Sequence, residues 1–423
     1  MQDQNPHFLV RKRYGFCPKN PGLLLLFGLL LIFAFPVQAQ IFKFTEGRKK
    51  QKIPFQLHRN LIIVEAKLNG KGPFNFLVDT GVSSSLITDA GLRDSIRFSR
   101  GPALEIAGVG SGSDLHAYFT PDLQVQLPGV TSENLTFAVL SEDVIQLGSY
   151  IGIPVTGILG YDFFNSFVIE VDFKKLNLIL HQPAEFKAPP KHEALPLKLE
   201  GNKPYLQTEI ETDAGKVPVK LLLDTGAGFA LSLDCSSDKR IKLPEKVLRS
   251  HLGVGLAGSV SGFLGRIPAL KLGRYTVNAV LASFPDSADI QAKTTVSRNG
   301  SLGLELFKRF SVIFDYPHQK LYLRNRISLA RPFEYDMCGI DLVAVPPKYR
   351  TYRVTNVHEN SAAAEAGILP GDELLSLDLH SASSYTLTEI SRIFHSYPDR
   401  KMNLLLKRDG QLIYAEVTLK RRI

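Results

Sequence analysis

A tripeptide, Asp-Thr-Gly, occurs twice in this chain, and each copy follows a short apolar run. The copies are Asp79-Thr80-Gly81 and Asp224-Thr225-Gly226. Each apolar run predicts a buried strand, and a carboxylate at the end of such a strand is costly unless a neighbouring group makes use of it. We therefore expect the fold to bring the two carboxylates together.

The two tripeptides belong to a longer internal repeat. The offset of 145 residues between Asp79 and Asp224 also joins the triplet Gly108-Val109-Gly110 to the triplet Gly253-Val254-Gly255. Two further segments lie 143 residues apart, at Gly157–Phe164 and Gly300–Phe307. Because these segments keep their order and nearly their spacing, the sequence predicts a duplicated unit with small loop insertions.

Composition and turn residues indicate the fold class and the order of domains. With 423 residues, 44% of them hydrophobic and 22% charged, the chain can form two or three domains with proper cores. Short strand-like runs broken by Gly, Pro, Asn and Asp predict an all-β fold. The expected ranges are 53–181 for the first unit, 182–196 for a linker, 197–324 for the second unit and 333–423 for a further module.

One short helix is expected in each unit, directly after a Leu-Gly pair. Asp162 and Glu305 fall in the first turn of these two helices. An acidic side chain is favourable there because the helix start presents free amide groups, so we expect both residues to act as caps and not as catalytic groups.

The N-terminus has the pattern of an export signal. Basic residues precede an apolar stretch at 23–35, and Val37-Gln38-Ala39 supplies the small residues of a cleavage site. We expect residues 1–39 to be a signal peptide and the mature protein to be periplasmic or secreted, with an uncleaved membrane anchor as the alternative. The Lys-rich residues 40–52 are expected to form a solvated tail, with an inhibitory segment as the alternative.

Charge and cysteine content exclude several classes of protein. The net charge of +9 is not gathered in a block long enough to indicate a nucleic-acid partner. Cys235 and Cys338, the two cysteines beyond the leader, are too few for a disulfide framework, and whether they pair is left open. No His or Cys cluster has metal-ligand spacing, so neither a metal nor a cofactor is expected.

Two carboxyl groups a few ångströms apart cannot both ionise cheaply, so they share a proton over a range of pH. A water held between Asp79 and Asp224 would lose a proton to the ionised member while the protonated member donates to a peptide carbonyl. The two threonines of the tripeptides would hydrogen-bond across the junction, and the two glycines would let backbone amides approach the carboxylates.

The two units resemble the lobes of aspartic peptidases of the pepsin and retropepsin superfamily. The resemblance covers residues 53–324 and rests on Asp-Thr-Gly after an apolar strand, followed by Ile158-Leu159-Gly160 in one unit and Ser301-Leu302-Gly303 in the other. Leu-Gly-x-Asp-x-Phe at 159–164 is especially similar to retroviral versions. The resemblance implies a bilobal β-rich fold, with both aspartates in a cleft at the lobe junction and extended peptides as substrates.

The same resemblance implies a flap that closes over the cleft. The first candidate is Gly108–Gly112 and the second is Gly253–Gly262, since glycine density suits a mobile hairpin tip, although ordinary turns have the same composition. Tyr118 follows the first stretch and is a candidate flap tyrosine, but we expect it to be a surface aromatic residue.

The sequence departs from the pepsin pattern directly after each tripeptide. Pepsin-like enzymes usually carry Ser or Thr there, whereas this chain has Val82 and Ala227. Without that hydroxyl the charged form of the pair loses a hydrogen-bond donor, which should raise its pKa values. We therefore expect activity at mildly acidic to near-neutral pH.

The last ninety residues resemble a PDZ domain similar to those of bacterial envelope proteases. The match rests on Ser361–Ile368, a small-residue helix with Ser361 as its cap, and on the Pro-Gly-Asp turn within Leu369–Leu377. The resemblance implies capture of C-terminal peptide tails, with Cys338-Gly339-Ile340 as the carboxylate loop and a helix bearing Ile390, Ile393 and Phe394 beside the groove. A module used only for packing is the alternative.

Three functional hypotheses follow. The first is an exported aspartic endopeptidase whose PDZ module binds the tails of substrates or partners, and the second is a non-catalytic peptide-binding protein with the same lobes. The third, a retroelement-derived processing enzyme, conflicts with the export signal and with both units lying in one chain. Because one chain supplies both aspartates, we expect a monomer to suffice. The cleavage specificity is left open.

Overall fold

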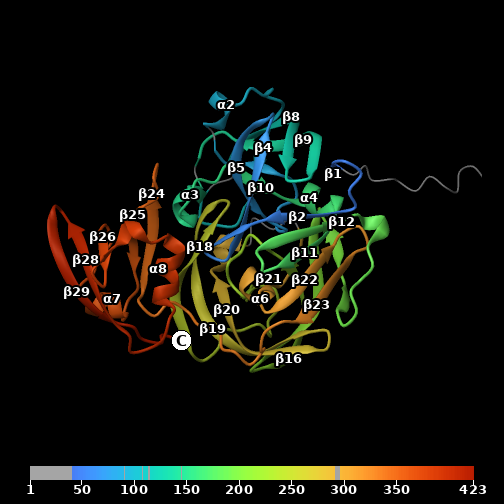
Figure 1. The fold of residues 1–423 in the computed structure, drawn as a ribbon. Coiled ribbons are helices and arrows are strands. Elements are labelled where there is room, and N and C mark those ends of the chain that lie inside the picture. The colour runs from blue at the N-terminus through green and yellow to red at the C-terminus, as the bar shows by residue number, and fades with distance from the viewer. Residues whose placement is uncertain (1–40, 90, 107, 113–114, 144, 291–295) are drawn as a thin grey trace, which may run out of the picture. The chain divides into compact units, whose positions relative to one another are not determined.

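The computed structural model describes residues 41–89, 91–106, 108–112, 115–143, 145–290 and 296–423 (Figure 1). The predicted signal peptide lies outside the described residues. Strands dominate the described residues and helices are short, so the all-β prediction is confirmed. No helix within these ranges is long and apolar enough to cross a membrane.

The first unit forms a nine-stranded sheet that closes into a barrel-like lobe, here called lobe 1. The order is β1-β9-β6-β10-β5-β4-β8-β7 with β3 beside β4, and a further pairing of β9 with β8 closes the sheet. The strands are β1 (Lys43–Phe44), β3 (Gln56–His58), β4 (Leu61–Leu68), β5 (Lys71–Val78), β6 (Leu86–Ile87), β7 (Ala103–Ile106), β8 (Leu115–Leu127), β9 (Val130–Leu140) and β10 (Gly157–Leu159). The helices are α2 (Leu92–Ser95), α3 (Leu147–Ile151) and α4 (Tyr161–Ser166).

The second unit, lobe 2, repeats this arrangement in eight strands. The order is β14-β15-β16-β21-β17-β20-β19-β18, and β15 also pairs with β19. The strands are β14 (Lys198–Glu200), β15 (Lys203–Thr212), β16 (Gly215–Leu223), β17 (Leu231–Leu233), β18 (Val247–Gly255), β19 (Gly258–Leu272), β20 (Tyr275–Pro285) and β21 (Gly300–Leu302). The helices are α5 (Ser287–Ile290) and α6 (Leu304–Phe307). In both lobes the strand before the aspartate runs parallel to the strand before the short helix, β5 with β10 and β16 with β21.

A six-stranded sheet built from both units joins the lobes, in the order β13-β23-β22-β11-β12-β2. The strands are β2 (Lys50–Pro54), β11 (Val168–Asp172), β12 (Asn177–His181), β13 (Glu193–Pro196), β22 (Phe310–Asp315) and β23 (Lys320–Asn325). Its centre is the antiparallel pair of β11 from the first unit and β22 from the second. The range predicted as a linker, 182–196, contains a 3-10 turn at Pro183–Glu185 and ends in β13, which pairs with β23.

The expectation of a solvated tail at residues 40–52 is wrong. β1 pairs with β9, and β2 pairs with β12 in the joining sheet. The reason is apolar anchoring within a Lys-rich segment, since Phe42 and Ile53 are both buried in the core. Their burial outweighs the solvation of the intervening lysines, which keep their side chains outside.

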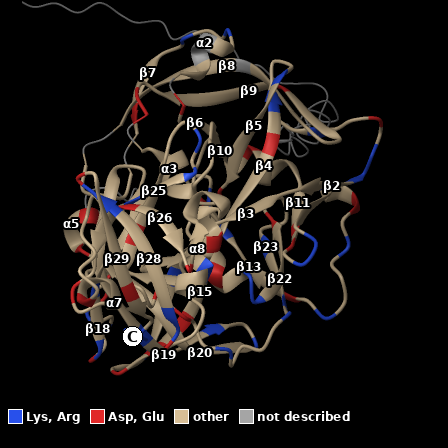
Figure 2. Cartoon of the chain, turned by 60° about the vertical axis from the view of Figure 1, so that its left-hand side comes forward, with Lys and Arg blue, Asp and Glu red and all other residues tan. Residues whose placement is uncertain are grey.

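The C-terminal domain is a separate six-stranded sheet with its own hydrophobic cluster. The strands are β24 (Ile340–Val345), β25 (Thr351–Val357), β26 (Glu373–Leu377), β27 (His380–Ser381), β28 (Lys401–Arg408) and β29 (Gln411–Thr418), with helices α7 (Ala362–Glu365) and α8 (Leu387–Phe394) and a 3-10 turn at Ala382–Ser384. Ser361 caps α7 as predicted, because its side chain accepts the amide hydrogen of Ala364. Figure 2 shows basic and acidic residues interspersed over the domain and the lobes.

Aromatic side chains hold the joining sheet against the two short helices. Phe314 on β22 is 1% exposed, and its ring lies 5.7 Å from that of Phe164 on α4 and 5.6 Å from that of Phe307 on α6. Both contacts are edge-to-face, a geometry that adds to the burial of area. One side chain of lobe 2 thus packs against helices of both lobes.

We predict that Phe314→Ala lowers the free energy of unfolding by about 3–5 kcal/mol, because a cavity replaces a fully packed ring. Chemical denaturation measures the change, and the lobes should unfold together since they share this sheet. The control is Leu243→Ala, which changes a side chain that is 41% exposed. A loss no larger than that of the control would contradict the prediction.

Candidate active site

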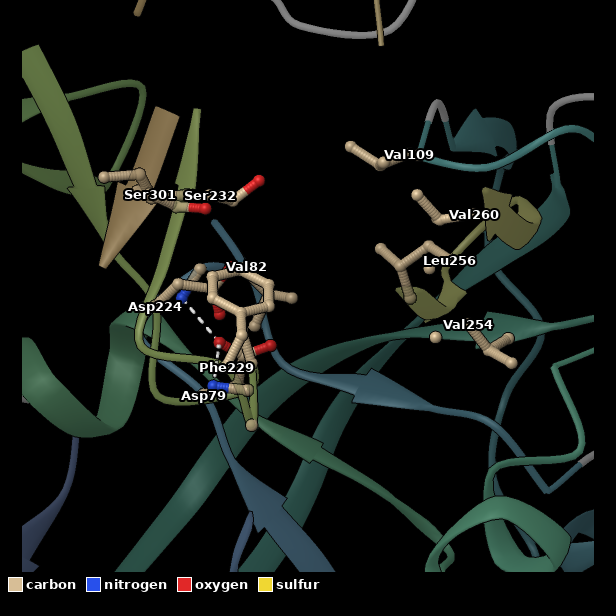
Figure 3. Close-up of a pocket in the computed structure, with 18 of the residues that line it drawn as sticks. Asp79, Val82, Val109, Asp224, Phe229, Ser232, Val254, Leu256, Val260 and Ser301 are labelled. Carbon is tan, nitrogen blue, oxygen red and sulfur yellow. Dashed lines mark hydrogen bonds between the residues drawn. The ribbon is translucent and has the colours of Figure 1, made fainter. Parts of the chain in front are cut away.

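The turns that follow β5 and β16 bring Asp79 and Asp224 together at the lobe junction (Figure 3). The carboxyl groups are within hydrogen-bonding reach of each other, and Asp79 is only 8% exposed. Its Oδ1 accepts the amide hydrogens of Gly81 at 2.6 Å and Gly226 at 3.1 Å. One amide comes from each lobe, so this oxygen links the two tripeptides.

Glycine is required at the third position of each tripeptide. A Cβ added to Gly81 would lie 3.0 Å from carboxyl atoms of both aspartates, and one added to Gly226 would overlap the Asp79 carboxyl. Any larger residue would push the carboxyl groups away from the amides that bind them. The glycines therefore set how closely the two lobes approach.

The threonines of the two tripeptides form a closed set of four hydrogen bonds across the junction. The hydroxyl of Thr80 accepts the amide hydrogen of Thr225 at 2.9 Å and donates to the carbonyl of Leu223 at 2.7 Å. Reciprocally, the hydroxyl of Thr225 accepts from the amide of Thr80 at 3.0 Å and donates to the carbonyl of Val78 at 2.9 Å. Both side chains are buried, so these bonds exclude water and fix the geometry of the carboxyl pair.

Burial raises the pKa of both aspartates. The pKa of Asp79 rises to about 7, first through burial and then through the charge of Asp224, while the amides of Gly81 and Gly226 and the charge of Lys203 oppose the rise. Burial also raises the pKa of Asp224, and the charges of Arg298 and then Lys203 oppose it. Near neutral pH the pair therefore retains a proton, which gives one acid and one base side by side.

Both lobes line a cavity of about 270 Å³ above the aspartates. The lobe 1 residues are Leu61, Leu77, Asp79, Gly81, Val82, Gly108, Val109, Ile145, Leu147, Tyr150 and Ile158. Lobe 2 contributes more polar residues, among them Lys203, Tyr205, Asp224, Ser232, Asp234, Ser283, Arg298 and Ser301. Figure 3 shows apolar side chains of the hairpin tips on one side of the aspartates and two serine hydroxyls on the other.

The structure places both candidate flaps at this cavity, each at the tip of a β-hairpin. β18 and β19 meet at a tight turn between Gly255 and Gly258, while residues 108–112 lie between β7 and β8. The tips are joined, because the amide of Ala257 donates to the carbonyl of Val109 at 3.1 Å and the amide of Gly112 donates to the carbonyl of Ala257 at 2.6 Å. A Cβ on Gly255 would overlap the Val109 carbonyl, so this glycine lets the tips touch.

Tyr118 is not the surface residue that the sequence led us to expect. It is 5% exposed, and its ring lies in the core beneath the guanidinium of Arg100, 4.8 Å from the ring centre. The reason is its register on β8, where it pairs with Val139 of β9 and shares the buried face. Tyr118 does not line the cavity.

Sequence reasoning missed two cationic residues of the site, Lys203 and Arg298. Lys203 begins β15 and Arg298 precedes β21, so both lie far along the chain from Asp224. A strand-by-strand comparison of the two units could have found them from the sequence. Lys203 in lobe 2 corresponds to Leu61 in lobe 1. Tyr205, two residues after Lys203, is opposite Leu222, and Ile63, two residues after Leu61, is opposite Leu77; Leu222 and Leu77 each lie two residues before the aspartate.

Asp162 and Glu305 lie in the first turns of α4 and α6, as predicted, and neither lines the cavity. Asp162 accepts weakly from the amide and hydroxyl of Ser85, both at 3.4 Å. Glu305 accepts from Lys308 and from Asn60 of lobe 1, both at 2.7 Å. They therefore connect other segments and do not cap their own helices through side-chain hydrogen bonds.

The predicted carboxylate loop of the C-terminal domain binds a carboxylate of its own chain. The amides of Cys338 and Gly339 donate to Asp336 at 3.3 and 2.5 Å. Cys338 is a buried free thiol and so is not paired with Cys235, the other free cysteine of the described residues. The loop thus has the expected place before β24, with its amides engaged internally.

Lobe 1 contacts both walls of the predicted groove, β24 and α8. The Arg59 guanidinium donates to the carbonyl of Leu342 on β24 at 3.2 Å, and the Arg59 amide donates to the hydroxyl of Thr388 on α8 at 3.0 Å. The same guanidinium donates to the carbonyl of Tyr150, a residue that lines the cavity, at 3.1 Å. One side chain therefore connects the groove to the wall of the candidate active site.

The comparisons with known proteins agree with this architecture. Residues 64–163 and 208–306 match the aspartyl protease family, and residues 353–408 match the PDZ domain family. Each lobe therefore matches the aspartyl protease family, and the C-terminal domain matches the PDZ domain family. The predicted resemblance is confirmed.

A crystal structure of basic 7S globulin from soybean is similar to this chain at a TM-score of 0.41 and 10% sequence identity, over 68% of this chain and 99% of that one. No curated protein matches the sequence.

We predict that Thr80→Val lowers the free energy of unfolding by roughly 2–4 kcal/mol, because it leaves the buried Leu223 carbonyl and Thr225 amide without partners. Thr80→Ser is the matched control, since it keeps the hydroxyl and loses only a methyl group. Chemical denaturation of the two variants compares them directly. If serine were as damaging as valine, the crossed hydrogen bonds would not be the stabilising element.

Proposed function

We propose that this protein is an aspartic endopeptidase that hydrolyses peptide bonds with a water molecule activated between Asp79 and Asp224. The observation that carries the proposal is the buried, proton-sharing carboxyl pair at the floor of a cavity that two hairpin tips cover. We expect an extended peptide to bind between the floor and the tips. A protein that only binds peptides has no use for such a pair, which costs free energy to bury.

The reaction needs one acid and one base, which the pair supplies at near-neutral pH. The ionised carboxylate takes a proton from the water while the water oxygen attacks the carbonyl carbon. The protonated carboxyl donates its proton to the carbonyl oxygen. The carboxyl that took the water proton then gives it to the amide nitrogen, the C–N bond breaks, and the other carboxylate regains its proton from a hydroxyl of the intermediate. A carboxylic acid and an amine leave, the pair returns to its starting state, and no bond between enzyme and substrate forms.

We also propose that the protein acts outside the cytoplasm. The support is the signal-like pattern of residues 1–39, with its basic start, apolar stretch and small residues at 37–39. The PDZ domain would bind C-terminal tails of substrates or partners along β24. Since Arg59 now contacts both walls of that groove, a tail would have to displace it.

Hydrolysis of a mixed peptide library tests the central proposal. We expect turnover that a pepstatin-type inhibitor blocks and that falls at least 1,000-fold in Asp79→Asn and in Asp224→Asn, because the variants lose the shared proton. Circular dichroism checks that the variants stay folded. Turnover that survives either substitution contradicts the mechanism, and peptide binding without any turnover supports the non-catalytic alternative.

The pH dependence follows from the direction of the pKa shift. Because the pKa of Asp79 is raised to about 7, the shared proton is present below this value and is lost as pH rises through it. We predict that kcat is retained at pH 5–6 and falls about tenfold for each pH unit above 7. A rate that stays constant to pH 9, or an optimum near pH 2, would be inconsistent with a buried pair of this kind.

Arg59→Ala tests whether lobe 1 blocks the PDZ groove. We expect C-terminal peptides with an apolar last residue to bind the full chain about tenfold more tightly after the substitution, because no guanidinium competes for the Leu342 carbonyl. The control is Arg48→Ala, which removes a cation that pairs with Glu46 away from the groove. Equal affinity in Arg59→Ala and wild type, measured by calorimetry, would show that the groove is not blocked by Arg59.

A further inference from the structure

The two walls of the active-site cavity differ in polarity although they descend from one repeated unit. β10 and β21 take the same place beside the aspartate-bearing strands, where Ile158 is opposite Leu77 and Ser301 is opposite Leu222. An apolar residue of lobe 1 thus corresponds to a serine of lobe 2. Both positions are part of the cavity wall, because Ile158 and Ser301 line the cavity.

Three further pairs of positions show the same exchange. Leu61 begins β4 and lines the cavity, whereas Lys203 begins β15 and lines it from the other lobe. Leu86 is opposite Ile158, whereas Ser232 is opposite Ser301. At the offset of 143 residues, Val155 precedes β10 where Arg298 precedes β21.

The two cations on the lobe 2 side face the carboxyl pair, and Arg298 also hydrogen-bonds the side chain of Tyr205. Neither Lys203 nor Arg298 forms an ion pair with a carboxylate among the residues that the structure describes, although both are partly buried. Burial lowers the pKa of Lys203 and the positive charge of Arg298 lowers it further, while the charges of Asp79 and Asp224 oppose the shift. The two cations therefore repel each other across the cavity wall. Two close, partly buried cations are costly unless an anion comes between them.

One carboxylate besides the catalytic pair lines this side of the cavity. Asp234 follows β17, and its Oδ1 accepts from the amide and hydroxyl of Ser236 at 2.8 and 2.6 Å. Asp234 is thus committed to Ser236, and the carboxyl pair carries a single charge that both cations share, so neither cation has a carboxylate partner of its own. The hydroxyls of Ser232 and Ser301 make no hydrogen bond to a described residue. Hydroxyl donors beside an ammonium and a guanidinium form the usual surroundings of a bound carboxylate.

We propose that Lys203, Arg298, Ser232 and Ser301 form a subsite for a carboxylate of the bound peptide. This inference rests on the proposed function and names its substrate class: peptides with an acidic side chain on the lobe 2 side of the scissile bond and an apolar side chain on the lobe 1 side. The carboxylate is that of a Glu or Asp side chain or that of a peptide C-terminus, since both offer the same chemistry. The lobe 1 subsite, with Leu61 and Ile158, accepts the apolar residue.

Paired peptides test the subsite through binding, independently of turnover. Asp79→Asn in the full chain is used with fluorescent peptides that are identical except for Glu or Gln beside the central bond. We expect the Glu peptide to bind at least tenfold more tightly, and the ratio to fall toward one in Lys203→Gln and Arg298→Gln on the same background. A second peptide pair, with a free or an amidated C-terminus at that position, identifies which carboxylate is preferred.

The control is Lys216→Gln, which removes an exposed lysine on β16 outside the cavity and should leave the ratio unchanged. A ratio near one for both peptide pairs in the Asp79→Asn chain overturns the subsite, and so does a ratio that Lys203→Gln and Arg298→Gln leave intact. Turnover by the chain with native aspartates separates the two proposals. Cleavage without a carboxylate preference removes the subsite alone, whereas a preference without cleavage removes the endopeptidase alone.

Discussion

The structure depends on keeping two carboxyl groups buried against each other. Their mutual repulsion and loss of water would drive the lobes apart if nothing opposed it. Four crossed hydrogen bonds of Thr80 and Thr225, together with the amides of Gly81 and Gly226, hold the junction closed. The joining sheet acts in the same direction, because β11 and β22 pair one strand from each unit. The raised pKa of the aspartates is the electrostatic result of this constraint.

Duplication explains both the symmetry of the site and its asymmetry. The junction needs equivalent groups from each half, so Asp, Thr and Gly are the same in both copies. The cavity walls do not need equivalent groups from each half. The lobe 1 wall is apolar at Leu61 and Ile158, and the lobe 2 wall is polar at Lys203 and Ser301. A peptide bound across the junction would therefore meet a different chemistry on each side, although both carboxyl groups beneath it come from the same repeated tripeptide.

The sequence predicted the elements that local pattern determines. The repeated tripeptide, the apolar strands before it and the Leu-Gly pairs were sufficient for the two lobes, and the Ser361 cap and the Pro-Gly-Asp turn for the PDZ domain. The sequence did not predict what depends on distant pairing. The Lys-rich segment forms strands because Phe42 and Ile53 are buried in the core beside β9 and β12. Tyr118 is buried because of its register on β8. Lys203 and Arg298 join the site because β15 and β21 both pair with β16, the strand before Asp224, and no local motif records these pairings.

The proposed reaction requires one shared proton between Asp79 and Asp224 at neutral pH. Carbon-13 NMR of a chain labelled at the aspartate carboxyl groups, followed from pH 3 to pH 9 and assigned with Asp79→Asn and Asp224→Asn, measures that proton directly. We predict a coupled titration of the two resonances that ends near pH 7, far above the range of an ordinary aspartate. Two independent titrations that are both complete below pH 5 would contradict the claim, because the pair would then be fully ionised and could not act as acid and base together.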